Sequence, residues 1–494
     1  MGLLAKLTRV IRRKRKNANE QATDSLPSQK QIRPVSSSLD ENLTFVSQLL
    51  GTNPDVVAGK FEIMGGEGLA GIVYISGLAN KDAINKNILE PLIARSRKFK
   101  NSQFFWKNRQ EFIRSRILTT VDIKETNRIE QVITAVLKGN TCLFVDGTDS
   151  AMIIGNVRFE KRSITAPETD TSVRGSREGF IEDIATNVSM VRRRLPTPDL
   201  RFETFFLGRF SRTEVRLAWI EGIVNPEIIE EARVRIRRID IDYVYDSSLI
   251  AELIEDKPTS LWPQIQLSER PDVVAANMVE GRFAVFCNGT PFVIIAPLLF
   301  WQNLQTPDDY TERPLAGTLF RLLRHGAFYV SLMASPVFIA IVSYHPSMIP
   351  QTLAMRIAAG REGVPFPSVF EALLLTLTID TLREAGTRLP RAIGTAVAVL
   401  GAVIIGQAAV AAGFVSPAII IIVSIAAIAN FTIPSLDLAN ATRIANYFLI
   451  ILGGVLGLLG VTAGMVLLLY SAVSLRSFGI PLFYPVAPGE LYGL

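Results

Sequence analysis

Two carboxylates, Glu371 and Asp380, stand inside an otherwise apolar helical stretch between Pro367 and Leu382. An acidic residue at bilayer depth costs roughly 2.5–3.5 kcal/mol on insertion scales, so such residues are usually functional or paired with a basic group. Rings of carboxylates select cations by their electric field, and this is the chemistry that the two residues could supply. The alternative is a helix that lies in the headgroup region with both carboxylates hydrated.

A helical wheel places the two carboxylates on different faces of this stretch. Glu371 shares a face with Leu375 and Thr378, whereas Asp380 lies on the far side with Arg383. A helix that is polar on two sides cannot face lipid on both, so it must contact protein or water, as a pore or a polar subunit interface allows. The residues expected in a pore or gate are Glu371, Leu375, Thr378 and Asp380. The residues expected to couple or brace this helix are Arg383, Glu384, Arg388 and Pro390.

No other set of residues indicates catalysis or metal binding. Cys142 and Cys287 lie in apolar runs without CxxC spacing, which favours buried, inert thiols over a disulfide or a metal site. The two histidines, His325 and His345, cannot build a zinc site with them at ordinary spacing. The sequence has no P-loop, GxGxxG turn or nucleophile elbow. We therefore expect no enzyme, no cofactor and no metal.

The distribution of charge divides the chain into a soluble and a membrane portion. Residues 1–320 carry nearly all the charge, whereas residues 392–474 hold only Asp437 and Arg443 among acidic and basic residues. The boundaries that we expect are 1–38 for a basic tail and polar linker, 39–170 and 171–320 for two α/β subdomains, 321–476 for the transmembrane domain, and 477–494 for a C-terminal tail.

The basic tail accounts for the net charge of +6, because residues 1–16 hold seven positive charges. Its apolar helical face predicts a helix on an anionic membrane surface, and a disordered tail is the alternative. We expect membrane lipid as the partner and no nucleic acid. The tail lacks the apolar core of a signal peptide, which predicts a cytoplasmic N-terminus. The basic residues concerned are Arg12, Arg13, Lys14, Arg15 and Lys16.

An internal sequence repeat predicts that the two α/β subdomains share one plan. Residues 71–93 and 215–236 each read as a strand, a glycine turn and an amphipathic helix. Residues 138–155 and 280–297 each read as two strands around Asp146-Gly147-Thr148 or Asn288-Gly289-Thr290, a pattern typical of a tight hairpin. Between the copies, the run Arg192-Arg193-Arg194 could bind phosphate or acidic lipid, or it could be a solvated or interface-facing turn.

Four apolar runs in the second half predict membrane helices: residues 327–344, 393–412, 419–433 and 447–473. The stretch 366–382 is ambiguous because of its carboxylates. Counting it as a span places Arg383, Arg388 and Arg391 on the cytoplasmic side, in agreement with the positive-inside rule. We therefore favour five spans with an external C-terminal tail over four spans and one re-entrant segment. The glycines from Gly453 to Gly464 predict close helix packing.

The chain resembles the A subunit of the GerA-type spore germinant receptor family over nearly everything after residue 40. The resemblance is carried by SREGFIEDIATNVSMVRRRL, ERPDVVAANMVEGRFAVFCNGTPFVIIAP, SYHPSMIP, REGVPFPSVFEALLLTLTIDTLREAGTRLPRAIG, GQAAVAAGFVSP and FTIPS. One departure is Asn288, where the family more often has Asp; Asn suits the same turn. The paralogous channel subunit that amplifies germination shares most of these motifs.

The resemblance implies a multi-pass protein of the bacterial spore inner membrane, with its soluble region in the spore core. It implies a permease-like B subunit and a lipoprotein C subunit as partners, and a homo-oligomer that conducts ions when a small germinant is sensed. The leading hypothesis is a cation-selective ring of Glu371-bearing helices. The alternative is a non-conducting scaffold in which Glu371 and Asp380 pair with arginines. A secondary transporter is disfavoured because no inverted repeat is visible.

Overall fold

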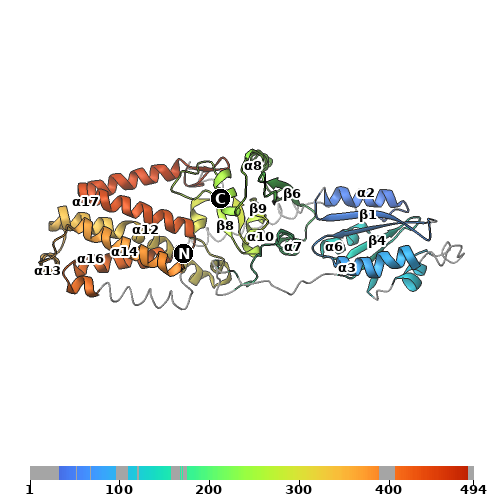
Figure 1. Cartoon of the computed structure of the whole chain (residues 1–494), viewed down its shortest axis with the longest axis horizontal. Helices are drawn as coiled ribbons and strands as arrows, with labels where there is room; N and C mark the ends of the chain where they lie inside the picture. The colour runs from blue at the N-terminus through green and yellow to red at the C-terminus, as the bar shows by residue number, and fades with distance from the viewer. Residues whose placement is uncertain are drawn as a thin grey trace, which may run out of the picture.

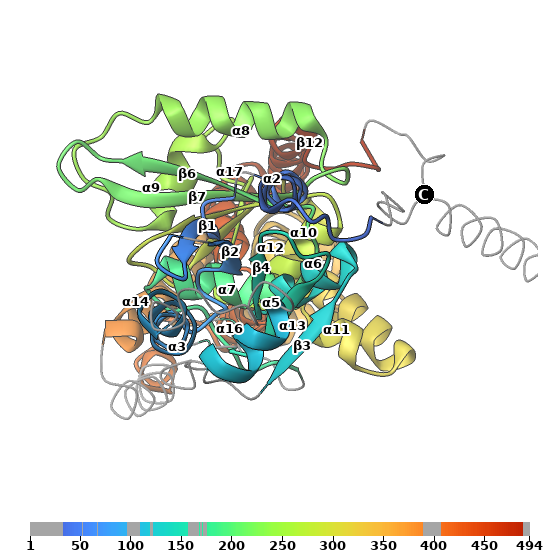
Figure 2. The ribbon, with the colours of Figure 1, turned by 90° about the vertical axis from the view of Figure 1, so that its right-hand side faces the viewer.

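The computed structural model describes residues 33–95 except 52 and 67, 109–118, 122–156, 167, 170, 175–388 and 407–487. The molecule is elongated, with subdomain 1 at one end, subdomain 2 in the middle and a helical bundle at the other end (Figure 1). Figure 2 views it along the long axis from the subdomain 1 end. The α/β region and the following helical region are the fold class that the sequence predicts.

Subdomain 1 is a five-stranded antiparallel sheet in the order β1-β2-β4-β5-β3, covered by helices on both faces. Its central strand β4 alternates strictly: Cys142 and Phe144 face α2 and α6, whereas Leu143 and Val145 face the opposite helices. Both faces are buried, which explains the continuous apolar run in the sequence. Its elements are α2 (Leu39–Leu50), β1 (Val56–Ile63), β2 (Gly68–Ile75), α3 (Lys81–Ile84), the π-helical turns η1 (Asn85–Leu89) and η2 (Pro91–Arg95), α5 (Arg109–Phe112), η4 (Ile113–Ile117), β3 (Ile123–Thr126), α6 (Ile129–Leu137), β4 (Thr141–Val145) and β5 (Ala151–Ile154).

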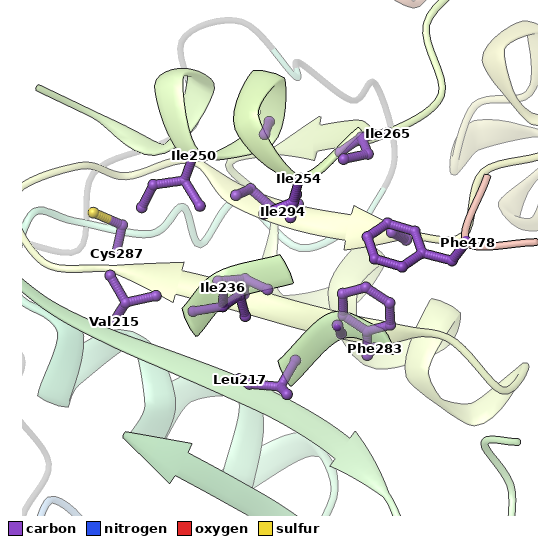
Figure 3. Packing of buried hydrophobic residues seen from close by; sticks show 14 of the residues in the cluster. Val215, Leu217, Ile236, Ile250, Ile254, Ile265, Phe283, Cys287, Ile294 and Phe478 are labelled. Carbon is purple, nitrogen blue, oxygen red and sulfur yellow. The ribbon is translucent and has the colours of Figure 1, made fainter. Parts of the chain in front are cut away.

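Subdomain 2 repeats this plan with the strand order β6-β7-β9-β10-β8. Helices α7 and α10 cover one face of the sheet, and α8 and α9 cover the other. Figure 3 shows the core between the sheet and helices α8 and α9, where Val215 and Leu217 of the sheet meet Ile236, Ile250 and Ile254 of these helices. The elements are α7 (Ile184–Arg194), β6 (Leu200–Leu207), β7 (Thr213–Ile220), α8 (Pro226–Arg238), α9 (Ser247–Ile254), β8 (Gln266–Ser268), α10 (Pro271–Val279), β9 (Phe283–Cys287) and β10 (Val293–Ala296).

The repeat extends to individual hydrogen bonds, which confirms the predicted common plan. The Oδ1 of Asp146 accepts from the backbone N–H of Leu39 at 3.2 Å, and the Oδ1 of Asn288 accepts from that of Ile184 at 3.3 Å. Gly147 and Gly289, in the corresponding turns, have φ of 77° and 92°. Asn288 therefore accepts the same hydrogen bond that an aspartate would accept, because the bond uses the oxygen of its side-chain amide.

The two subdomains meet through a buried ion pair. Arg192 on α7 donates from Nε and Nη2 to the two carboxylate oxygens of Asp55, at 2.7 and 3.0 Å, and its guanidinium lies 5.0 Å from the ring centre of Phe202. Asn53 lies beside it, accepting from the N–H of Phe202 at 2.8 Å. Of the predicted basic turn, Arg192 faces the interface, whereas Arg193 is exposed.

In the described residues, the bundle contains four long helices, with short helices next to subdomain 2 and at the far end. The short helices η5 (Phe300–Leu304) and α11 (Asp308–Thr311) come first, and α12 (Pro314–Tyr344) then runs away from subdomain 2. At the far end the chain forms η6 (Pro346–Met348) and α13 (Gln351–Ala359), and α14 (Ser368–Arg388) runs back toward subdomain 2. Helices α16 (Pro417–Phe431) and α17 (Leu436–Val473) complete the bundle (Figure 1). Two of them, α12 and α17, are long and apolar enough to cross a membrane by length and composition. The predicted helix 393–412 lies mostly outside the described residues.

Helix α17 folds back on itself at Gly457, whose φ of 62° and ψ of −146° lie outside the helical region. Gly464 on the second arm packs against Leu449 on the first, and a Cβ at Gly453 would meet the carbonyl of Pro336 on α12 at 2.9 Å. The prediction of one span over 447–473 is therefore wrong: the run contains a helical hairpin, because only glycine readily adopts that backbone conformation. The prediction that these glycines allow close packing is confirmed within the chain.

The hairpin brings the chain back to subdomain 2, so the predicted external C-terminal tail is also wrong. Strands β11 (Arg476–Ser477) and β12 (Ile480–Pro481) form a small ladder at the junction between subdomain 2 and the bundle. Ser477 Oγ donates to the carbonyl of Gln264 at 2.6 Å, and Phe478 belongs to the core of subdomain 2. The error arises from treating residues 447–473 as one straight helix, whereas the backbone reverses at Gly457.

A pH dependence of stability is expected at this junction. Burial, followed by the nearby carboxylates of Asp437, Glu252 and Asp256, raises the pKa of Glu255 from 4.5 to about 7. The folded chain therefore binds this proton more tightly, and the stabilisation is present below about pH 4.5 and is lost as the pH rises through about 7. Because Glu255 is partly solvated, we expect a loss of about 1–2 kcal/mol between pH 5 and pH 8.

The Glu255→Gln variant should flatten this profile and be the more stable protein at pH 8. Urea midpoints of the full chain in detergent, measured across the pH range, test this expectation. Glu227→Gln is the matched control because Glu227 is exposed on α8 and is not among the carboxylates that raise the pKa of Glu255. Parallel profiles of wild type and Glu255→Gln would contradict the expectation.

Candidate functional site in the helical bundle

A cluster of polar side chains surrounds Asp380 inside the bundle. One carboxylate oxygen of Asp380 accepts from Nη1 of Arg443 at 3.0 Å, and the other accepts from the hydroxyl of Tyr447 at 2.8 Å. Arg383, one turn further along α14, donates to the amide oxygen of Asn430 at 3.2 Å, and its guanidinium lies 5.1 Å from the ring centre of Phe431. Three helices, α14, α16 and α17, thus share one network.

The cluster borders a small cavity with about 40 Å³ of room for the centres of water-sized molecules, enough for a few waters beside the charged groups. Asn446 donates to the carbonyls of Ser331 and Leu332 on α12, both at 3.0 Å, so the fourth helix joins the network through its backbone. The wall combines one carboxylate with two guanidinium groups. The residues that line it are Ser331, Ser335, Thr376, Ile379, Asp380, Arg383, Val423, Ala426, Ala427, Asn430, Phe431, Arg443 and Asn446.

Glu371 forms a second polar node near the far end of the bundle. Its side chain has no exposed surface; one oxygen accepts from the backbone N–H of Ser416 at 2.8 Å, and the other lies 3.5 Å from Nη2 of Arg361. Ser416 is the residue before α16, so Glu371 binds one of the N–H groups that a helix start leaves without an intrahelical partner. This carboxylate ties the first turn of α14 to the beginning of α16.

The structure separates the residues that the sequence assigned to a pore or gate. Leu375 packs in the apolar core beside Glu371, and the Thr378 hydroxyl donates to the carbonyl of Leu374 on its own helix at 2.7 Å. Asp380 lies nine residues after Glu371, which corresponds to about 13 Å along the helix axis. Glu371 and Asp380 therefore belong to two separate polar contacts along α14, one with α16 and one with α17.

The predicted coupling residues have different surroundings. Arg383 lies in the Asp380 cluster, whereas Glu384 and Arg388 form an exposed pair at 2.6 Å on the outer surface of α14. Pro390 lies outside the described residues, as do the basic tail residues Arg12, Arg13, Lys14, Arg15 and Lys16. Their predicted roles stay predictions.

The sequence interpretation did not identify the partners of the two carboxylates. Arg361 and Arg443 supply the cations, and Tyr447 and Asn430 complete the Asp380 cluster. A signal for one of them was available, because Arg443 is the only basic residue between positions 392 and 474. A lone cation in an apolar segment requires an anionic partner, and Asp380 is a suitable candidate.

The arrangement can hold α14 in place and can supply polar groups along a water-accessible path. Within the described residues, no group of three or more His, Cys, Asp or Glu side chains is placed to hold a metal ion. Both cysteines are free and buried, as predicted, and burial raises the pKa of Cys287 to about 12. The molecule is a tandem α/β region joined to a helical bundle with internal ion pairs, and two of the bundle's helices are long and apolar enough to cross a membrane.

Comparisons with known proteins identify the family. The family model described as "Bacillus/Clostridium GerA spore germination protein" matches residues 44–494. Spore germination protein KA of Bacillus subtilis is 39% identical over 94% of this chain and 85% of its own length, and the uncharacterized membrane protein YfkQ of the same organism is 39% identical over 93% and 88%. The chain belongs to the GerA family of spore germination proteins.

A solved structure also matches the soluble part. It is the crystal structure of the N-terminal domain of the A subunit of the Bacillus megaterium spore germinant receptor GerK3. The match has 32% sequence identity and a TM-score of 0.42, and it covers 55% of this chain and 99% of that chain.

Proposed function

We propose that this chain is the A subunit of a spore germinant receptor and converts germinant sensing into cation release across the spore inner membrane. The observation that carries the proposal is the Asp380 cluster, a charged and hydrogen-bonded network that borders a small cavity inside apolar helices. Such groups are costly in a membrane interior and mark ion paths and gates more often than they stabilise a fold. The soluble region would face the spore core, and the bundle would cross the membrane several times.

Helix α14 is the moving part in this proposal. At one node Glu371 holds α14 to α16, and at the other Asp380 holds it to α17. Breaking either contact frees a carboxylate, which could then attract cations in an assembly of several copies. A partner subunit that senses the germinant would shift the equilibrium by binding the released arrangement more tightly. The permease-like B subunit and the lipoprotein C subunit are the proposed partners.

A non-conducting scaffold is the second candidate, and a specific observation favours it. Both carboxylates are paired with arginines within the chain, Glu371 with Arg361 and Asp380 with Arg443. Paired charges can fix helix register without any ion flow. On this hypothesis, neutral substitutions that keep the shape should leave ion release unchanged once the complex has assembled.

Potassium release from dormant spores after germinant addition separates the two candidates. Glu371→Gln keeps the acceptor for the Ser416 N–H but removes the charge, and Glu384→Gln serves as the matched control on the outer surface of the same helix. At matched protein levels, altered release rate or ion preference in Glu371→Gln alone supports conduction or gating. Normal release and selectivity in both variants would favour the scaffold.

A further inference from the structure

The C-terminal hairpin, residues 475–483, fastens the second arm of α17 to subdomain 2. It begins two residues after α17 ends at Val473 and turns at Phe478 and Gly479, whose φ values are 49° and 82°. Leu482 donates its N–H to the carbonyl of Leu475 at 3.0 Å, closing the loop. A loop of this length leaves little slack between the helix and the domain.

The side chain of Phe478 is inserted into the core of subdomain 2. Its ring is 4% exposed, meets Phe283 edge-on at 4.9 Å and lies 4.4 Å below the guanidinium carbon of Arg235. Figure 3 shows it beside Phe283, at the end of the cluster formed by Ile254 and Ile265. An aromatic side chain buried in a neighbouring domain anchors the segment that carries it.

Hydrogen bonds fix the hairpin on both sides of this ring. Ser477 Oγ donates to the carbonyl of Gln264 at 2.6 Å and accepts from the N–H of Leu298 at 3.1 Å. The N–H of Phe478 donates to Oδ2 of Asp256 at 2.7 Å. All of these groups except Asp256 are buried, so their loss would leave polar atoms without partners.

A second aromatic contact connects the hairpin to η5 and, through it, to the middle of α12. Phe483 stacks on Phe300 with ring centres 4.5 Å apart, and Phe300 in turn meets Phe328 of α12 at 5.7 Å. The N–H of Phe300 donates to the carbonyl of Leu482 at 2.8 Å. The hairpin therefore holds subdomain 2, α12 and the second arm of α17 as one unit.

We propose that the C-terminal hairpin transmits displacements of subdomain 2 to the Asp380 cluster. The path runs from Phe478 to the second arm of α17, and from Gly464 to Leu449 on the first arm, which carries Arg443 and Tyr447. Each contact is close-packed, so movement of one element displaces the next. The functional consequence rests on the proposed role in ion release, whereas the mechanical connection stands independently of it.

Spin labels test the mechanical connection in the full chain in detergent. Labels at Tyr243→Cys on subdomain 2 and Tyr470→Cys on α17 occupy exposed sites, and the buried native cysteines should not react. We expect a narrow distance distribution that broadens with Phe478→Ala and stays narrow with Val486→Ala, the control at an exposed position nearby. An unchanged distribution in Phe478→Ala would overturn the proposal.

A slack variant tests transmission without removing the anchor. Two glycines inserted after Ser474 add up to about 7 Å of chain and leave Phe478 in place. We expect potassium release to slow by roughly tenfold, within the usual range of coupling between sites. Normal release in this variant, while Glu371→Gln alters release, would overturn transmission and leave the proposed function standing. Normal release in both would count against the proposed function as well.

Discussion

Replacing Arg192 with methionine should lower the free energy of unfolding of the soluble region by about 3–5 kcal/mol. The Asp55 carboxylate would remain buried between the two subdomains without its bidentate partner, because the Arg192 and Asp55 side chains are only 1% and 9% exposed. Most of this loss of stability comes from the buried Asp55 carboxylate, which no longer has a cationic partner, since the methionine side chain can still pack against Phe202. Pulse proteolysis of the full chain across a urea series measures the change.

Two further variants make this prediction specific. Arg193→Met changes the exposed neighbour and should shift stability by less than about 0.5 kcal/mol. The double variant Asp55→Leu with Arg192→Met should recover most of the loss, because an apolar pair of similar volume replaces the buried ions. A small effect of Arg192→Met alone would mean that water reaches Asp55 and that the subdomain interface is looser than described.

The soluble half could be predicted from its sequence because its signals are local. The Asp-Gly and Asn-Gly turns have positive φ angles at their glycines, and the two strands predicted within residues 138–155 are found as β4 and β5. The two copies then reinforce each other, since the same order of patterns occurs twice. The repetition indicated a common plan for the two subdomains, whereas the strand order within each sheet depends on long-range pairing and was not predicted.

The bundle could not be predicted in the same way because an apolar composition does not show where the chain reverses its direction. A run of 27 apolar residues reads as one long span, yet the backbone at Gly457 reverses it. Neighbouring glycines in the run give the same sequence signal whether they pack against another helix or form a turn. The ion-pair partners were equally hidden, since Asp380 and Arg443 are 63 positions apart.

Replacing Asp380 with alanine should be among the most damaging changes in the bundle, at about 2–3 kcal/mol, which is less than for a fully buried ion pair because the Asp380 and Arg443 side chains are 23% and 26% exposed. Among the residues that line the cavity, Asp380 is the single carboxylate, and it lies beside two cations, Arg383 and Arg443. Its removal leaves both guanidinium groups without an anion and deprives the Tyr447 hydroxyl of its acceptor. Thermal stability of the purified chain in detergent, together with the amount of full-length protein in the membrane fraction, measures the loss.

The excess of positive charge in the cluster predicts that losing the carboxylate costs more stability than losing one of the arginines. Arg443→Gln should cost less than Asp380→Ala, because Asp380 would keep Tyr447 as a donor and Arg383 as a nearby cation. Asp380→Asn combined with Arg443→Gln should recover part of the loss, and the coupling energy of the pair follows from the four-variant cycle. Glu384→Ala breaks an exposed pair with Arg388 and should cost less than about 0.5 kcal/mol. Equal losses for Asp380→Ala and Glu384→Ala would mean that the Asp380 cluster is fully hydrated, and the case for a gate at this position would then fail.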